Sequence, residues 1–180
     1  VLERIHALGD EQVPLADALD RHLANDVAAI ADNPPHDNSA MDGYAVRFAD
    51  TATASGSTPI RLQVIEDIPA GTVPQRKVST GQASRIMTGA PVPEGADTVI
   101  RVEDTRSEDD WVEILEPEDG VGENIRGQGD DMKSGEVLLR AGDLVGPGEI
   151  GVLATAQHAN LTVTRRPTIA ILSSGDELVE

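Results

Sequence analysis

Three short segments of this chain combine carboxylates, hydroxyls and glycines in ways that suit the binding of an oxyanion or a hard cation. They are residues 38–45 (NSAMDGYA), 85–91 (RIMTGAP) and 124–131 (NIRGQGDD). Each places small and polar residues around one side chain that could do chemistry: Asp42, Thr88 and Asp131. Loops on a rigid scaffold often carry such chemistry, but Pro, Asn, Asp and Gly also form ordinary turns. Taken singly, each segment therefore has a plain structural alternative.

The residue types indicate different tasks at such a site. Asp42 and Asp131 could hold a divalent cation such as Mg²⁺, which takes one or two carboxylates together with substrate oxygens and waters. The Thr88 hydroxyl could donate to an oxyanion, and Arg126 could grip one through its planar guanidinium. The alternative for residues 124–131 is a solvated Gly-Asp loop, and for Asp131 both interpretations stay open.

A fourth segment follows an apolar run near the end of the chain. Residues 168–172 (TIAIL) predict a parallel strand buried on both faces, and residues 174–178 (SGDEL) come soon after it. Ligands bind at the carboxyl ends of such strands, which makes residues 174–178 a candidate site. The alternative is a helix start capped by Ser174 or Asp176. Because a lone parallel strand has no partner in this sequence, we expect the chain to be cut just inside a further α/β domain.

Most of the elements that must position these residues are short strands. Between residues 43 and 145, apolar stretches alternate with Gly, Pro and Asp, which predicts a compact β domain of barrel-like or sandwich-like form. Its predicted strands cover residues 43–48, 61–65, 83–87, 98–102, 111–115 and 137–140. Outside this region, helical spacing predicts a short amphipathic helix within residues 12–28 and a second helix from Pro147, followed by a strand over residues 161–164.

Composition excludes several classes of function. Of 180 residues, 39% are hydrophobic and only three are aromatic, so the core must be aliphatic. A net charge of −18, from 14 basic and 32 acidic residues, repels phosphate, which argues against nucleic-acid and membrane partners. The absence of cysteine excludes disulfides and thiolate metal sites, and no signal peptide is visible, which predicts a cytoplasmic protein. The acidic, Lys-poor composition predicts a salt-adapted source, with an Arg-biased genome as the alternative.

Taken in order, the four segments resemble the molybdopterin molybdenumtransferase family, which includes MoeA and the E domain of gephyrin. They match the family's SAMDGYA, RIMTGAP, NIR…GED and SGDEL elements, with Asp130 in place of the Glu of the third. The resemblance implies a mixed α+β fold in three parts. These are a discontinuous helical and β domain (residues 1–28 and 146–167), an irregular barrel-like β domain (29–145) and the first strand of a molybdopterin-binding α/β domain (168–180).

The same resemblance implies an enzyme of molybdenum cofactor biosynthesis. It would insert molybdate into adenylylated molybdopterin, with Mg²⁺ as cofactor and release of AMP. The implied residues are Asp42, Thr88 and Glu177 as catalytic groups, Ser39, Arg126 and Asp176 in binding the pterin substrate, and Asp42 with Asp131 as metal ligands. Implied partners are a second copy of the chain and the pterin-adenylylating protein.

The family's site lies between the second domain of one subunit and the third domain of the other. With most of the third domain absent, the resemblance implies that this chain alone is inactive. The alternative is a non-catalytic dimerisation or scaffold module of a gephyrin-like protein.

Overall fold

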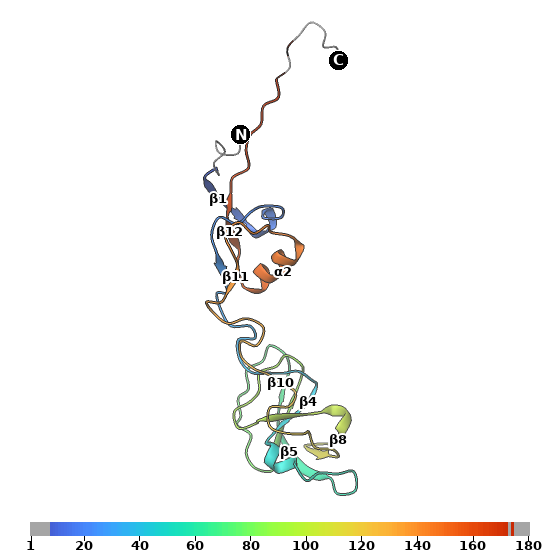
Figure 1. Ribbon diagram of the computed structural model, residues 1–180. Helices are drawn as coiled ribbons and strands as arrows, with labels where there is room; N and C mark the ends of the chain where they lie inside the picture. The colour runs from blue at the N-terminus through green and yellow to red at the C-terminus, as the bar shows by residue number, and fades with distance from the viewer. Residues whose placement is uncertain (1–7, 173, 175–180) are drawn as a thin grey trace. The chain divides into compact units, whose positions relative to one another are not determined.

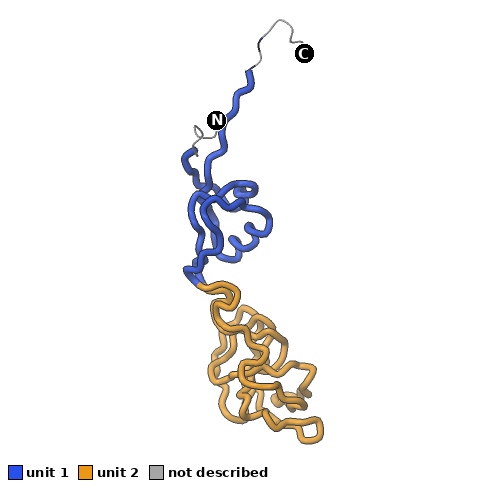
Figure 2. The backbone as a smooth tube through the Cα atoms, in the orientation of Figure 1, with its two compact units in different colours: residues 1–31, 134–180 blue, residues 32–133 orange. Residues whose placement is uncertain are grey.

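A computed structural model describes residues 8–172 and residue 174 and divides the chain into two compact units (Figures 1 and 2). We call residues 32–133 the β unit; the discontinuous unit combines residues 1–31 with residues 134–180. The predicted domain boundaries followed residues 28 and 145, so residues 134–145 group with the discontinuous unit rather than with the β domain. The reason is strand pairing, because β11 (Val137–Leu139) forms an antiparallel pair with β2 (Val27–Ala28).

The discontinuous unit joins segments from both ends of the chain. Its β1 (Asp10–Pro14) pairs antiparallel with β12 (Asn160–Thr164), and α2 (Pro147–Thr155) packs beside them. Pro147 occupies the first turn of α2, and the Gly146 N–H donates to the Glu149 carboxylate at 3.0 Å, which satisfies one free donor of the helix start. The buried core of the unit is aliphatic and consists of Ala18, Leu23, Val27, Val145, Leu153, Leu161 and Val163. The predicted helix at Pro147 and the predicted strand at 161–164 are confirmed.

The amphipathic helix predicted within residues 12–28 is wrong. The chain there forms β1, a single 3-10 turn (Leu15–Asp17) and an irregular stretch. Backbone bonds to a distant segment take the place of helical ones: the Leu23 N–H donates to the Asp143 carbonyl at 2.9 Å. The apolar spacing that suggested a helix instead places Ala18 and Leu23 in the core from an irregular backbone.

The β unit is built on one six-stranded sheet with the strand order β7-β4-β6-β5-β9-β8. Its strands are β4 (Gly43–Val46), β5 (Ile60–Ile68), β6 (Gln82–Ile86), β7 (Thr98–Arg101), β8 (Thr105–Glu108) and β9 (Trp111–Ile114). All neighbours are antiparallel except β5 and β6, which are parallel. The unit also contains a small pair of β3 (Asn38–Ser39) with β10 (Ile125–Arg126), the one-turn helix α1 (Phe48–Thr51) and a 3-10 turn (Val102–Asp104). The strands expected from sequence are present with shifted ends, and β8 is an addition.

Strand β4 lies at the centre of the packing. Tyr44 and Val46 enter one buried cluster, whereas Ala45 between them enters a second, so β4 is covered on both faces. Gly43 is required at its start because a Cβ there would lie 1.9 Å from the carbonyl oxygen of Ile100 on β7. The close approach of these two strands fixes the position of the residue before Gly43, which is Asp42.

Residues 168–172 form no strand in this structure. The side chains of Ile169, Ile171 and Leu172 are 77%, 92% and 93% exposed. A strand needs a neighbour to bond its backbone, and within residues 8–172 none lies beside this run. Within the same described part of the chain, no helix has the length and apolar character needed to cross a bilayer.

Candidate functional site

Asp42, Thr88 and Val102 meet at one edge of the six-stranded sheet. Asp42 directly precedes β4, Thr88 follows the end of β6, and Val102 follows the end of β7. Since β4 is antiparallel to both neighbours, the start of β4 and the ends of β6 and β7 lie at the same edge. The pairing of three strands thus brings together two of the predicted residues that are far apart in sequence.

Thr88 holds the Asp42 carboxylate at this edge with two hydrogen bonds. The Thr88 N–H donates to Asp42 Oδ1 at 2.8 Å, and the Thr88 hydroxyl donates to the same oxygen at 2.7 Å. These two bonds, with the positive charge of Arg85 adding to them, keep the pKa of Asp42 below its ordinary value. Asp42 is therefore ionised at neutral pH. Its second oxygen accepts no hydrogen bond from the described residues and is available to a ligand.

The hydrogen bonds of Ser39 set the shape of the Asp42 loop, residues 38–42. The buried Ser39 hydroxyl donates to the Met41 carbonyl at 2.6 Å and accepts from the Met41 N–H at 3.2 Å. The Ser39 backbone bonds the segment after β6 through Gly89 and Ala90, at 2.8 and 3.0 Å. Ser39, predicted to bind the pterin substrate, is thus occupied in building the loop that presents Asp42.

Arg126 belongs to a second loop attached to the same edge. Strand β10 places Arg126 opposite Asn38, and the Asn124 carbonyl accepts a hydrogen bond from the Ala40 N–H at 2.8 Å. The Asn124 side chain in turn donates to the Val99 carbonyl of β7 at 2.9 Å. The Arg126 side chain is exposed and forms no ion pair within residues 8–172. Its guanidinium is free to meet an anion beside the Asp42 loop.

An open pocket of about 470 Å³ surrounds the Asp42 carboxylate. Its lining residues are Met41, Asp42, Thr88, Arg101, Val102 and Glu103. The Arg101 guanidinium lies 2.7 Å from the Asp104 carboxylate and 3.7 Å from that of Glu118. The Asp104 carboxylate raises the pKa of Arg101, and that of Glu118 adds a smaller effect, so Arg101 stays charged beside Asp42. Arg101 was missed from sequence, although a charged residue that ends the apolar run 98–100 was a usable signal.

Asp131 lies in another loop with partners of its own. Its carboxylate accepts from the Asn33 side-chain amide at 3.0 Å, and its N–H donates to the Asn33 carbonyl at 2.9 Å. No hydrogen bond joins Asp131 to Asp42 in the described part of the chain. The same residues contain no group of three or more His, Cys, Asp or Glu side chains that could hold a metal ion. Asp176 and Glu177 lie outside the described residues.

Comparisons with known proteins find relatives of one family. Residues 1–156 match the family described as MoeA N-terminal region (domain I and II). The chain is 42% identical over 172 residues to a molybdopterin molybdenumtransferase of Bacillus subtilis (strain 168), covering 94% of this chain and 40% of that protein. A protein of the same name from Nostoc sp. (strain PCC 7120) is 44% identical over 169 residues, covering 94% and 38%.

A solved structure shows the same fold. It is the molybdopterin biosynthesis moeA protein from Pyrococcus horikoshii OT3, with a TM-score of 0.84 and 40% sequence identity over 90% of this chain and 43% of that one. The fold class expected from sequence is confirmed by this likeness. The chain spans about 40% of the length of the curated relatives it matches.

Proposed function

Because the chain belongs to the MoeA family through its N-terminal region, we propose that its protein works in molybdenum cofactor biosynthesis as a molybdopterin molybdenumtransferase. The observation that carries the proposal is the Asp42 carboxylate, which Thr88 holds at the sheet edge with one oxygen open to a pocket. In the proposed reaction, molybdate is inserted into adenylylated molybdopterin and AMP is released. The chain supplies the Asp42 side of that site.

The charges around Asp42 support a role with anionic substrates. Molybdate and the phosphates of an adenylylated pterin are negative, and a bare carboxylate beside them would repel both. Arg126 on the neighbouring loop offsets this repulsion, because its planar guanidinium forms no ion pair with the described residues and can bond two oxygens of an oxyanion. Arg101 adds a second cation in the pocket, which it shares with Asp104 and Glu118. In this proposal Thr88 positions Asp42, because the Thr88 hydroxyl already donates its hydrogen bond to the Asp42 carboxylate.

The proposed cation is Mg²⁺, and the Asp42 pocket offers it one carboxylate. Mg²⁺ in substrate sites takes one or two carboxylates and completes its shell with phosphate oxygens and waters. Asp42 offers one such oxygen, so it would hold the ion, and Asp131 remains a predicted second ligand. Bound there, Mg²⁺ would neutralise charge on the substrate oxyanions.

Further proposed roles belong to residues and partners outside the Asp42 pocket. We propose catalysis by Glu177 and substrate binding by Asp176, with the site completed by the partner subunit of a homodimer. The pterin-adenylylating protein is the proposed donor of the substrate, and the cytoplasm the proposed location. A non-catalytic scaffold role is the competing proposal, and no feature of the described residues favours it over the open Asp42 pocket.

Measuring AMP release tests the proposal. Adenylylated molybdopterin, molybdate and Mg²⁺ are incubated with this chain, and separately with this chain extended by the remaining domains of the family. We expect turnover in the extended protein and little in the chain alone. Asp42→Asn in the extended protein should abolish most of it, whereas Glu116→Gln, an equal charge change at an exposed residue, should not. Unchanged turnover in Asp42→Asn would refute the assignment of this site.

A further inference from the structure

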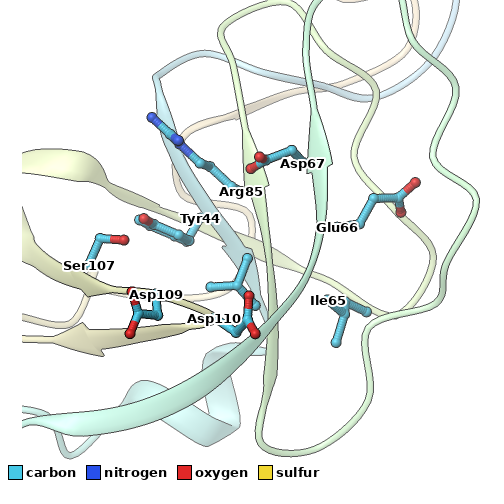
Figure 3. Close-up of a pocket in the computed structure, with 9 residues that line it drawn as sticks. Tyr44, Ile65, Glu66, Asp67, Arg85, Ser107, Asp109 and Asp110 are labelled. Carbon is cyan, nitrogen blue, oxygen red and sulfur yellow. The ribbon is translucent and has the colours of Figure 1, made fainter.

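A second pocket of about 260 Å³ lies on the β unit, and it shares no lining residue with the Asp42 pocket (Figure 3). Pairing across β4, β6 and β5 sets one of its walls, because Tyr44 lies opposite Arg85 and Arg85 lies opposite Asp67. The other wall is the β8–β9 hairpin, which contributes Ser107 and the turn residues Asp109 and Asp110. Strands from both halves of the sheet therefore line one cavity.

The turn that carries Asp109 and Asp110 is fixed in place. The Val64 N–H of β5 donates to the Asp110 carbonyl at 2.8 Å, which ties the turn to the sheet through its backbone. The carboxylates of Asp109 and Asp110 form no hydrogen bond or ion pair within the described residues. Both negative charges are thus held beside the cavity, and none of the described residues supplies a counter-ion to them.

Tyr44 provides an independent sign that the pocket takes a ligand. The residue is only 2% exposed, and its ring packs in the aliphatic core with Val46, Leu62 and Ile100. Its hydroxyl has no hydrogen-bond partner among residues 8–172, and Figure 3 shows it at the pocket on the side of Ser107. The chain thus leaves this hydroxyl to water or to a ligand in the pocket, although the rest of the residue is buried. Phe would fill the same core position, so packing alone does not require the hydroxyl.

Two of the pocket's charged groups are directed elsewhere. The Glu66 carboxylate accepts from the backbone N–H groups of Gln75 and Arg76, at 2.9 and 3.0 Å, and points away from the cavity. The Arg85 guanidinium extends away from Asp109 and Asp110 in Figure 3. Asp67 lines the wall formed by β5, and the groups beside the hairpin are two hydroxyls and two carboxylates, which are mainly acceptors.

We propose that this pocket binds a small organic molecule carrying a protonated primary amine. An ammonium group has three donors and no acceptor, which matches the two carboxylates and the hydroxyl oxygens of Tyr44 and Ser107. A directly ligated metal ion fits less well, because the described carboxylates do not converge into a group of three. This site is separate from the Asp42 pocket and does not depend on the proposed transferase reaction.

Calorimetric titration of the 180-residue chain with 1,4-diaminobutane tests the proposal. We expect saturable binding of one molecule per chain. Asp109→Asn and Asp110→Asn should each weaken it about tenfold, since each removes a charge-assisted hydrogen bond. Asn tolerates the left-handed backbone of Asp109, whose φ is 48°, so the turn should keep its shape.

Two further variants distinguish specific binding in the pocket from general attraction of a cation to an acidic surface. Tyr44→Phe keeps the ring in the core and should weaken binding about threefold by removal of one neutral hydrogen bond. Glu116→Gln removes one exposed acidic charge outside the pocket and should leave binding unchanged. Equal weakening by Glu116→Gln and Asp109→Asn, no effect of Tyr44→Phe, or no saturable binding would each overturn the proposal. So would full displacement of the diamine by an equal concentration of Mg²⁺, which would identify a metal site instead.

Discussion

Asp42 lies in a loop shaped by backbone hydrogen bonds and one buried hydroxyl, whereas the Asp131 loop, residues 127–133, adds carboxylate acceptors to its backbone hydrogen bonds. In that loop the Gly127 N–H donates to Asp130 at 2.6 Å, and the Gln128 N–H donates to Asp37 at 2.8 Å. The Asp42 loop leaves one carboxylate oxygen facing a pocket. The two acidic loops thus differ in what their carboxylates do: Asp130 accepts from an N–H group of its own loop, whereas Asp42 presents an oxygen to a pocket.

The largest expected effect concerns two glycines, Gly43 directly after the Asp42 loop and Gly129 within the Asp131 loop. Gly43→Ala would force a Cβ against the Ile100 carbonyl of β7, so we expect a loss of about 3 kcal/mol in the free energy of unfolding. In Gly129→Ala the nearest atom to the new Cβ is Cγ of the Lys133 side chain, at 3.2 Å, and the residue keeps a left-handed φ of 72°, which together should cost about 1 kcal/mol. Urea unfolding followed by Trp111 fluorescence measures both. Equal losses would mean that β4 and β7 can separate easily.

The second test compares the two carboxylates in turnover. In the extended protein, Asp42→Asn should lower AMP release about a hundredfold, because it removes the charge that faces the substrate. Asp131→Asn should lower it only about threefold, since its partner Asn33 can still be bonded by the new amide. The Mg²⁺ dependence of each variant is the informative readout. Equal losses with the same rise in Mg²⁺ requirement would show that both residues serve one ion, as the sequence predicts.

A smaller effect tests the structural use of carboxylates in the Asp131 loop. Asp130→Ala removes the acceptor for the Gly127 N–H and should destabilise the β unit by about 1 kcal/mol. Asp130→Asn keeps an acceptor oxygen and should lose less. The same Trp111 signal reports both variants. If Asp130→Ala were neutral, the loop would be held by its backbone bonds alone and would resemble the Asp42 loop.

The smallest expected effect is on the titration of Asp42. Thr88→Val removes the hydroxyl donor but keeps the N–H, so the pKa of Asp42 should rise part of the way to its ordinary value. Thr88→Ser should leave it low. A carboxyl whose pKa is lowered by folding stabilises the folded state at pH values above its unfolded pKa, and this contribution is lost as the pH falls through its folded pKa. Thr88→Val should therefore also make the free energy of unfolding less sensitive to acid. Carboxyl chemical shifts against pH measure the change, and an unchanged pKa would assign the effect to the N–H alone.

Much of the β unit was predictable because its strands carry apolar residues between clear turn signals. Residues 98–101 and 111–114 are examples, with alternating or continuous apolar side chains. Strand β8 was not predictable, since its sequence TRSE is polar and it forms the edge of the sheet. Strand β1 was missed for a related reason: it is short and half-exposed, and its partner β12 lies far along the chain.

The candidate site was predictable in its members but not in its assembly. Sequence motifs indicated Asp42 and Thr88, yet only the pairing of β4 with β6 brings them into hydrogen-bond contact. The role of Ser39 could not be read from its neighbours, because its partners Gly89 and Ala90 come from another motif. Arg101 was missed since its importance depends on the pocket that it shares with Asp42.

The split of the discontinuous unit has a consequence for the order of events during synthesis. Residues 10–28 leave the ribosome before β11 and β12, their pairing partners, have been made. Holding the two ends of so long an intervening segment together would cost about 4 kcal/mol in chain entropy if that segment were unstructured. The β unit removes this cost once folded, because Asn33 and Met132 at its two ends are bonded to each other at 2.9 and 3.1 Å. Nascent chains should therefore complete the β unit first, and a variant that slows it should delay protection of β1 from proteolysis.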